Sequence, residues 1–141
     1  MKLGGERFIF SDLTAEDKET GLVWTRDANI AGRSMDWSDA NDYITQLNRQ
    51  RYAGHNDWRL PTKEEIQALV DYPKSQGHTT SLYELFNKIG FKNIQSLNYW
   101  SSTTNAYNTD IAWFVNMWYG IMYVFYKSDG SFYVWPVRSG Q

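Results

Sequence analysis

The stretch Gly54-His55-Asn56-Asp57-Trp58-Arg59-Leu60-Pro61-Thr62-Lys63-Glu64-Glu65-Ile66 holds a complete helix-start signal. Thr62 and Glu65 have the spacing of a capping box, in which the threonine side chain accepts a hydrogen bond from the third helical amide and the glutamate reaches back to the cap residue. The apolar residues that follow recur on one helical face, as Ile66, Leu69 and Val70. We therefore predict a helix that begins directly after Thr62.

Asp57-Trp58-Arg59, just before this helix, could supply a catalytic Asp and Arg or could serve the scaffold. We interpret the motif as structural for two reasons. Trp58 lies just before the predicted helix, where a buried side chain is expected, and the carboxylate of Asp57 and the guanidinium of Arg59 can connect loop segments through hydrogen bonds. Glu64 and Glu65 do not form a catalytic pair either. Adjacent side chains on a helix point about 100° apart, and acids are favoured in the first turn.

Hydrophobic periodicity predicts further elements on both sides of this motif. A helix is expected over residues 36–48, capped at its first position, and a short third helix over residues 82–89. An early strand is expected over residues 20–26, preceded by a short apolar piece at residues 8–10. From Tyr99 onward, short apolar runs separated by turn residues predict β-hairpins. This order predicts an α+β fold with two main helices flanking a mostly antiparallel sheet.

Size and charge predict one soluble domain spanning residues 1–141. A net charge of -2 without a basic run excludes the usual electrostatic footprint of a nucleic-acid binder. The start of the chain lacks the apolar stretch of a signal peptide, and no segment approaches the roughly 20 apolar residues of a membrane span. We therefore expect no nucleic-acid partner and no membrane insertion, while a cell or virion surface stays open as the location.

The chain has no cysteine and only two histidines, His55 and His78, on predicted loops. Thiolate metal sites and thiol nucleophiles are thus impossible, and two separated histidines do not make a metal centre. We expect no cofactor, no metal site and no catalytic residues.

Residues 99–135 contain 13 of the 24 Phe, Tyr and Trp residues, mixed with Ser, Asn, Asp and Gly. Antibody paratopes share this composition, because rigid aromatic rings supply contact area and small polar residues supply adaptable hydrogen bonds. The alternative is that these rings simply fill the core.

Strand alternation allows these two interpretations to be tested. It places one set of residues inward: Trp113, Val115, Met117, Met122, Val124, Tyr133, Trp135 and Val137. It leaves another set outward or at turns and strand ends, and we expect the following aromatics to be exposed on one contiguous surface: Phe114, Tyr119, Tyr123, Phe125, Tyr126 and Phe132. A patch of that kind normally marks an interaction site.

The Asp57–Ile66 run resembles the Asp-Trp-Arg-Leu-Pro-Thr-x-x-Glu-Leu signature of the Legionella collagen-like protein C-terminal domain family. The resemblance extends to residues 20–24, 99–103, 112–113 and 134–138, and so covers nearly the whole chain. It implies a C-type lectin-like fold, in which the N- and C-terminal strands pair, two helices flank the sheet, and the segment before the last strand forms a ligand-binding face. Formylglycine-generating enzymes are similar in fold, but they need active-site cysteines. The calcium-binding Glu-Pro-Asn and Gln-Pro-Asp triplets of sugar-binding lectins do not occur here either.

Glu and Gln occur eleven times in residues 1–95 and never in residues 96–140. Adenine-directed mutagenesis of Asn codons cannot produce Glu, Gln, Lys, Met or Trp, so residues 105–133 resemble the variable region of a diversity-generating retroelement protein. The positions reachable from Asn codons are Tyr107, Asp110, Ile111, Phe114, Tyr119, Ile121, Tyr123, Phe125, Tyr126, Ser128, Asp129, Ser131 and Phe132. Trp118 is not reachable, and we expect it to be an invariant contact if it is exposed.

These observations predict a non-catalytic ligand-binding domain whose diversified aromatic face captures an unknown macromolecule, which we expect to be a protein. Two alternatives remain open. One is a non-diversified adhesin-type domain that binds a surface glycan or protein, and the other is an enzyme of the formylglycine-generating type, which the lack of cysteine disfavours.

Overall fold

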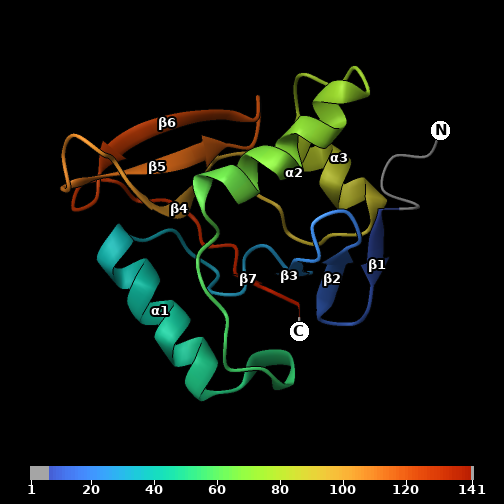
Figure 1. Ribbon diagram of the computed structural model, residues 1–141, viewed down its shortest axis with the longest axis horizontal. Coiled ribbons are helices and arrows are strands. Elements are labelled where there is room, and N and C mark those ends of the chain that lie inside the picture. Colours follow the sequence, from blue (N-terminus) through green and yellow to red (C-terminus); the bar gives the residue numbers. More distant parts are fainter. Residues whose placement is uncertain (1–6, 141) are drawn as a thin grey trace.

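The computed structural model describes residues 7–140 (Figure 1). The elements follow one another in the order β1 (Phe8–Phe10), β2 (Thr14–Asp17), β3 (Val23–Thr25), α1 (Trp37–Arg49), a 3-10 turn η1 (Tyr52–Gly54), α2 (Lys63–Ser75), α3 (Leu82–Ile89), β4 (Asn98–Thr104), β5 (Ile111–Asn116), β6 (Ile121–Tyr126) and β7 (Val137–Arg138). Residues 1–6, for which the sequence predicts no export signal, lie outside the described residues. The elements confirm the predicted α+β class, with two antiparallel sheets rather than one.

The predicted capping box at the start of α2 is confirmed. The Glu65 backbone N–H donates to Thr62 Oγ1 at 3.1 Å, and the Thr62 N–H donates to Glu65 Oε1 at 2.9 Å. Helix α1 begins after Asp36, whose side chain accepts from the Asp39 N–H at 2.8 Å. Helix α3 ends at Gly90 with φ 143°, where an added Cβ would lie 2.6 Å from the ring of Phe10. A glycine is therefore required at that helix end.

The first sheet has the strand order β1-β2-β3-β7 and joins the two ends of the described chain. Val23 pairs with Arg138 and Trp24 with Val137, so the pairing of an early strand with the last one follows the expectation. Strand β2 was not predicted, because Thr-Ala-Glu-Asp shows no apolar alternation. The buried Ala15 nevertheless pairs with Trp24 in the middle of this sheet.

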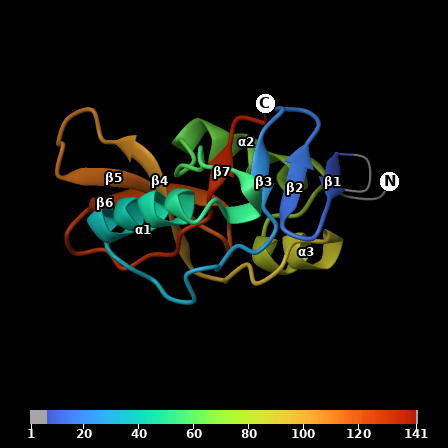
Figure 2. The same ribbon diagram turned by 90° about the horizontal axis from the view of Figure 1, so that it is seen from below.

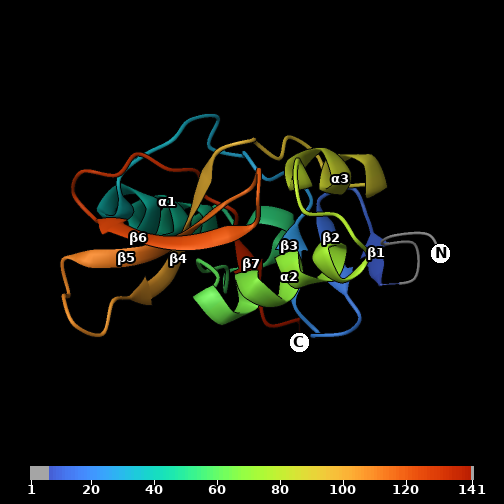
Figure 3. The same ribbon diagram turned by 90° about the horizontal axis from the view of Figure 1, so that it is seen from above.

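The second sheet, in the order β4-β5-β6, lies between α1 and α2. On one face, Ala40 and Ile44 of α1 pack in a cluster with Trp100 and Phe114. On the other face, residues of α2 share the larger core with Tyr99, Val115 and Met117. Figure 2 shows α1 across the near side of this sheet, and Figure 3 shows it on the far side with β6 in front. Strand β6 forms the outer edge.

The Asp57-Trp58-Arg59 motif connects three parts of the fold, which supports the structural interpretation. Arg59 makes two hydrogen bonds of 2.7 and 2.8 Å to the Glu65 carboxylate, and its backbone exchanges two 2.9 Å hydrogen bonds with Val137. Asp57 accepts from Arg138 at 2.7 Å. The hydrogen bond from Arg138 holds the pKa of Asp57 below its ordinary value despite partial burial. Both charged side chains thus serve the scaffold rather than a reaction centre.

A second ion pair is fully enclosed in the first sheet. Arg7 donates from Nε and Nη2 to the two carboxylate oxygens of Asp17, each at 2.8 Å, and both side chains are buried. The Arg7 guanidinium also lies 4.8 Å from the ring centroid of Tyr72 on α2. Because fork-to-fork contacts fix orientation as well as distance, this pair ties β1 and β2 to the helix.

Candidate ligand-binding surface

A continuous series of aromatic rings leads from the core to the open side of the second sheet. The indole of Trp100 is fully buried and donates to the Met35 carbonyl at 2.9 Å. Phe132 lies 4.5 Å, between ring centroids, from both Trp100 and Phe114. Tyr123 then lies 6.0 Å from Phe114, and Phe125 lies 6.0 Å from Phe132. The outer rings therefore pack on the buried rings of Trp100 and Phe114 and on the half-buried ring of Phe132.

The structure exposes most of the residues that the sequence singles out as ligand-binding or variable. The exposed members are Tyr107, Asp110, Trp118, Tyr119, Ile121, Tyr123, Phe125, Tyr126, Ser128, Asp129 and Ser131. Ile111 and Phe132 are half-buried, and Phe114 is buried. The residues expected to anchor the last segment, Trp135 and Val137, are buried as predicted.

The prediction of an exposed Phe114 is wrong, since this side chain is only 8% exposed. The alternation argument assumes that one face of the strand is exposed to solvent. Strand β5 is instead covered on both faces: Phe114 packs towards α1, and Val115 packs towards α2. Phe132 is also not substantially exposed, because it fills the space between Trp100 and Phe114. Phe114 and Phe132 belong to the support of the surface rather than to its contact area.

Four inward assignments are met only in part or not at all. Trp113, Met122 and Tyr133 are half-buried, and Val124 is 37% exposed. Trp113 and Val124 pair with each other on the α2 side of the sheet, where the helix contacts β4 and β5. An edge strand has no neighbour on one side, so neither of its faces is fully covered.

The exposed aromatics do not all share one face. Tyr123 pairs with Phe114 and Phe125 with Ala112, so both rings lie on the α1 side. Tyr126 pairs with Ile111 and points to the opposite side by strand alternation. The rings of Phe125 and Tyr126 nevertheless lie 6.2 Å apart between centroids, so the aromatic residues of β6 continue around the edge of the sheet. That they form one contiguous surface stays a prediction. We call the exposed residues Tyr119, Tyr123, Phe125 and Tyr126 the aromatic rim.

Asparagine side chains fix the turns that carry the loop aromatics. Asn105 accepts from the N–H of Tyr107, a residue that is 97% exposed, and Asn116 accepts from the N–H groups of Trp118 and Tyr119. Such bonds let Asn imitate a backbone turn. Trp118 also stacks on Tyr83 of α3 with ring centroids 5.6 Å apart, a support that the sequence analysis did not identify.

A small pocket of about 300 Å³ lies on the α2 side, lined by Lys63, Glu64, Gln67, Trp113 and Met122. Lys63 Nζ is 4.2 Å from the centroid of the Trp113 ring, which is a cation–π contact. Sequence reasoning missed this pocket because it treated Trp113 as a core residue and Lys63 as part of a helix cap. Only the contact between α2 and β5 brings the two together.

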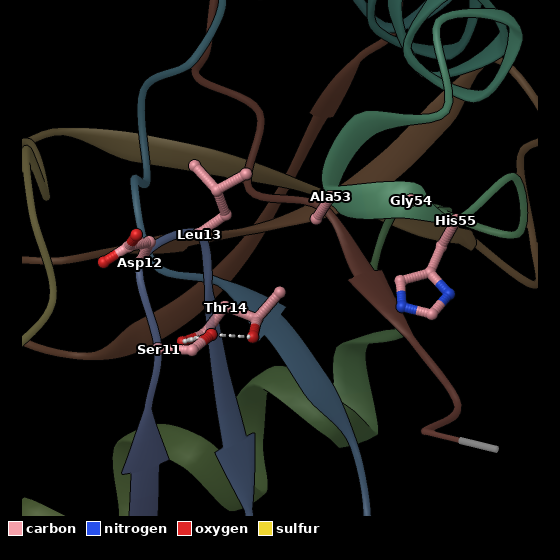
Figure 4. A pocket seen from close by; sticks show the side chains of 7 residues that line it. All are labelled: Ser11, Asp12, Leu13, Thr14, Ala53, Gly54 and His55. Carbon is pink, nitrogen blue, oxygen red and sulfur yellow. Dashed lines mark hydrogen bonds between the residues drawn. The ribbon is translucent and has the colours of Figure 1, made fainter.

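A wide pocket of about 820 Å³ lies away from the aromatic rim, between the β1–β2 turn and η1 (Figure 4). Ser11 and Thr14 are hydrogen-bonded to each other at 2.6 Å across its floor. Asp12, its one carboxylate, lies on the far side from His55 in the close view. No acid–base pair is thus assembled here, and across residues 7–140 no three His, Asp or Glu side chains converge as metal ligands would.

Helices on both sides of an antiparallel sheet, together with the pairing of an early strand with the last one, are consistent with the class of C-type lectin-like domains. The chain belongs to the family of the Lcl C-terminal domain, whose model matches residues 13–138. Membership points to a ligand-binding, adhesin-like domain and not to a known enzyme family. None of the curated proteins matches the chain significantly. Between residues 7 and 140, every helix is too short or too polar to cross a bilayer.

Proposed function

We propose that this domain captures a protein ligand through the aromatic rim and the adjoining loop residues Tyr107 and Trp118. The observation that carries the proposal is the series of rings from Trp100 to Tyr123 and Phe125, which places exposed aromatics on a rigid base. Rings that are already ordered lose little conformational entropy on binding. Aromatic residues of this kind supply most of the binding energy in protein interfaces.

The charge around the rim fits a protein ligand better than a sulfated polysaccharide. Strand β6 carries no charged residue, and the exposed side chains that follow it include Asp129. The nearest basic group, Lys127, is held by Trp37 at 4.1 Å and by Thr104 Oγ1 at 2.9 Å. A polyanion would need several free cations on this surface, whereas an apolar protein epitope needs none.

Replacing Tyr123 with Ser tests the proposal. The wild-type domain is used to select binders from a yeast-displayed library of extracellular protein domains, and the dissociation constant of each binder is measured. We expect Tyr123→Ser to weaken binding by about 2 kcal/mol or more, which is roughly 30-fold. The fold should be unchanged, because Tyr123 is 53% exposed.

Ile9→Ser is the matched control, because Ile9 is 52% exposed on β1, at the opposite end of the molecule. It should bind as the wild type does. A glycan array probed in parallel covers the alternative ligand class. Binding to glycans alone, or a captured protein that binds Tyr123→Ser and wild type equally, would show that the proposed function is wrong.

We further propose that residues 105–133 are diversified by a retroelement. In support, most positions reachable from Asn codons are exposed, while the unreachable Trp113, Met117 and Trp135 are buried or half-buried. A mutated surface on a largely unmutated support changes specificity without changing the fold. Phe114 and Phe132 are the reachable positions that lie in this support.

Sequencing the surrounding locus checks this second proposal. We expect a reverse-transcriptase gene and a near-copy of the segment that encodes residues 105–133, with adenines where the two copies differ. The codons of Trp118, Met122 and Lys127 should be identical in both copies. A locus without such a copy, or with differences at non-adenine positions, would leave an adhesin-type domain of fixed specificity.

A further inference from the structure

Strand β6 is an unprotected sheet edge. Of its six residues, five have side chains that are more than a third exposed: Ile121, Tyr123, Val124, Phe125 and Tyr126. Within residues 7–140, it has a neighbouring strand on one side only, and Figure 1 shows its other side at the margin of the molecule. Natural edge strands are usually blunted by charge, proline or a bulge. The sequence Ile-Met-Tyr-Val-Phe-Tyr has no charge and no proline, and its register with β5 is unbroken.

We propose that β6 pairs antiparallel with β6 of a second copy of this chain, about a twofold axis at Val124. The two β4-β5-β6 sheets would then form one continuous sheet with an aromatic rim from each copy side by side. This inference does not depend on the identity of the ligand.

The hydrogen-bond register places the axis at Val124. The Lys127 N–H donates to the Asp110 carbonyl at 2.8 Å, and Tyr126 is paired with Ile111. In an antiparallel ladder, the backbone groups of successive residues point alternately towards and away from the neighbour. Met122, Val124 and Tyr126 therefore direct their backbone groups outward. With Val124 on the axis, the two Val124 residues exchange N–H and C=O groups, and Met122 faces Tyr126 of the second copy. The Tyr126 carbonyl already accepts from the N–H groups of Asp129 and Gly130 at 3.3 and 3.0 Å, so Tyr126 offers its N–H to the second copy.

Charges at the two ends of β6 favour this antiparallel self-pairing. Lys74 Nζ donates to the Gly120 carbonyl at 2.6 Å, which places a cation at the start of the strand. The exposed carboxylates of Asp110 and Asp129 lie near its end, where they outnumber one cation, Lys127, which contacts Trp37 and Thr104. Antiparallel pairing brings the start of one β6 next to the end of the other, so opposite charges meet at both ends. A parallel neighbour would place like charges together.

The available area is compatible with a reversible dimer. Edge pairing covers the backbone of β6 and the side chains of Ile121 and Val124, while Tyr123 and Phe125 stay on the α1 face of the sheet. The covered area is below the roughly 800 Å² per partner of a standard stable interface. An interface of this size associates in a concentration-dependent manner, and it leaves the aromatic rim free for a ligand.

Sedimentation velocity over roughly 1 to 200 µM tests the proposal, because binding at this strength is half-saturated in that range. We expect wild type to shift from monomer to dimer. Val124→Lys places two like charges together at the axis and should raise the dissociation constant at least tenfold. Ile9→Lys adds the same charge to β1, the exposed edge of the other sheet, and should dimerise as wild type does.

A cysteine crosslink provides a second readout that does not rely on disruption. The chain has no cysteine, so Val124→Cys introduces a single thiol. A hydrogen-bonded antiparallel pair has Cα atoms about 5.5 Å apart, within the range that a disulfide spans. Mild oxidation should convert Val124→Cys to a covalent dimer at least tenfold faster than Tyr107→Cys, whose side chain is freely exposed on a loop.

Three results would overturn the proposal: a wild-type monomer at all concentrations, equal crosslinking of the two cysteine variants, or loss of dimer in Ile9→Lys but not in Val124→Lys. A monomeric wild type whose β6 instead binds an extended peptide would assign the edge to a heterologous strand. Ligand binding by a folded, monomeric Val124→Lys would leave the proposed function intact, so the two proposals fail separately.

Discussion

Replacing Trp58 with Ala is expected to lower the free energy of unfolding by about 3 to 5 kcal/mol. The indole is 2% exposed, and its N–H donates to the Tyr52 carbonyl at 2.9 Å. Truncation would leave a cavity between α1 and the motif and would remove one of the two donors to that carbonyl, the other being the His55 N–H at 3.1 Å. Asn48, which holds the Trp58 backbone through two 2.8 Å hydrogen bonds, would keep the chain from closing the gap. Denaturant unfolding followed by circular dichroism measures the change.

Trp118→Ala is the control for this experiment, since Trp118 is 37% exposed, stacks on Tyr83 and has a more distant edge contact with Tyr119. Its loss should cost about 1 kcal/mol, the order of an exposed aromatic pair. If Trp58→Ala proved as stable as Trp118→Ala, the motif would have to be something other than a scaffold anchor.

Asp17→Asn is expected to destabilise the domain by about 3 to 5 kcal/mol, because it leaves Arg7 as a buried charge without its carboxylate. The control is Glu19→Gln. Glu19 approaches Arg7 at 3.7 Å, but its side chain is 67% exposed, so we expect a change below about 1 kcal/mol. Equal effects of the two substitutions would show that the enclosed pair contributes no more than a surface contact.

The same ion pair predicts a pH dependence. Burial raises the pKa of Asp17, but the hydrogen bonds and charge of Arg7 outweigh it, so the folded-state pKa lies below the ordinary value of 3.8. As the pH falls, Asp17 therefore takes up a proton at a higher pH in the unfolded chain than in the folded one. Between the folded-state and unfolded-state pKa values, the free energy of unfolding rises with pH. The contribution is complete above pH 3.8 and is lost as the pH falls through the folded pKa. Thermal melts from pH 6 to pH 2 should fall more steeply for wild type than for Asp17→Asn.

Local signals in the sequence were sufficient to predict the helices. The capping box at Thr62 and the Asp36 cap each depend on residues within one turn, so tertiary structure did not change them. Strand β2 escaped prediction because Asp17 is buried only through Arg7, a partner ten residues away that no pattern identifies.

The candidate surface was predicted in outline but not in orientation. Loop residues such as Tyr107 and Tyr119 are exposed because turn chemistry is local. Phe114 was misplaced because period-two alternation separates the two faces of a strand but cannot say that both are covered. That information comes from α1 and α2, whose positions depend on contacts across the whole chain.

The position of β7 has a consequence for biosynthesis. Val137 and Arg138 lie between β3 and the Asp57–Arg59 segment, bonded to both, so the first sheet and the motif close only when the last strand arrives. A nascent chain cannot complete this fold until residue 138 has left the ribosome. A frameshift or stop codon before residue 137 removes that strand, and with it the pairings that close the first sheet and the motif. The exposed residues of β6 are thus displayed on the complete fold only when the chain is translated in frame through residue 138.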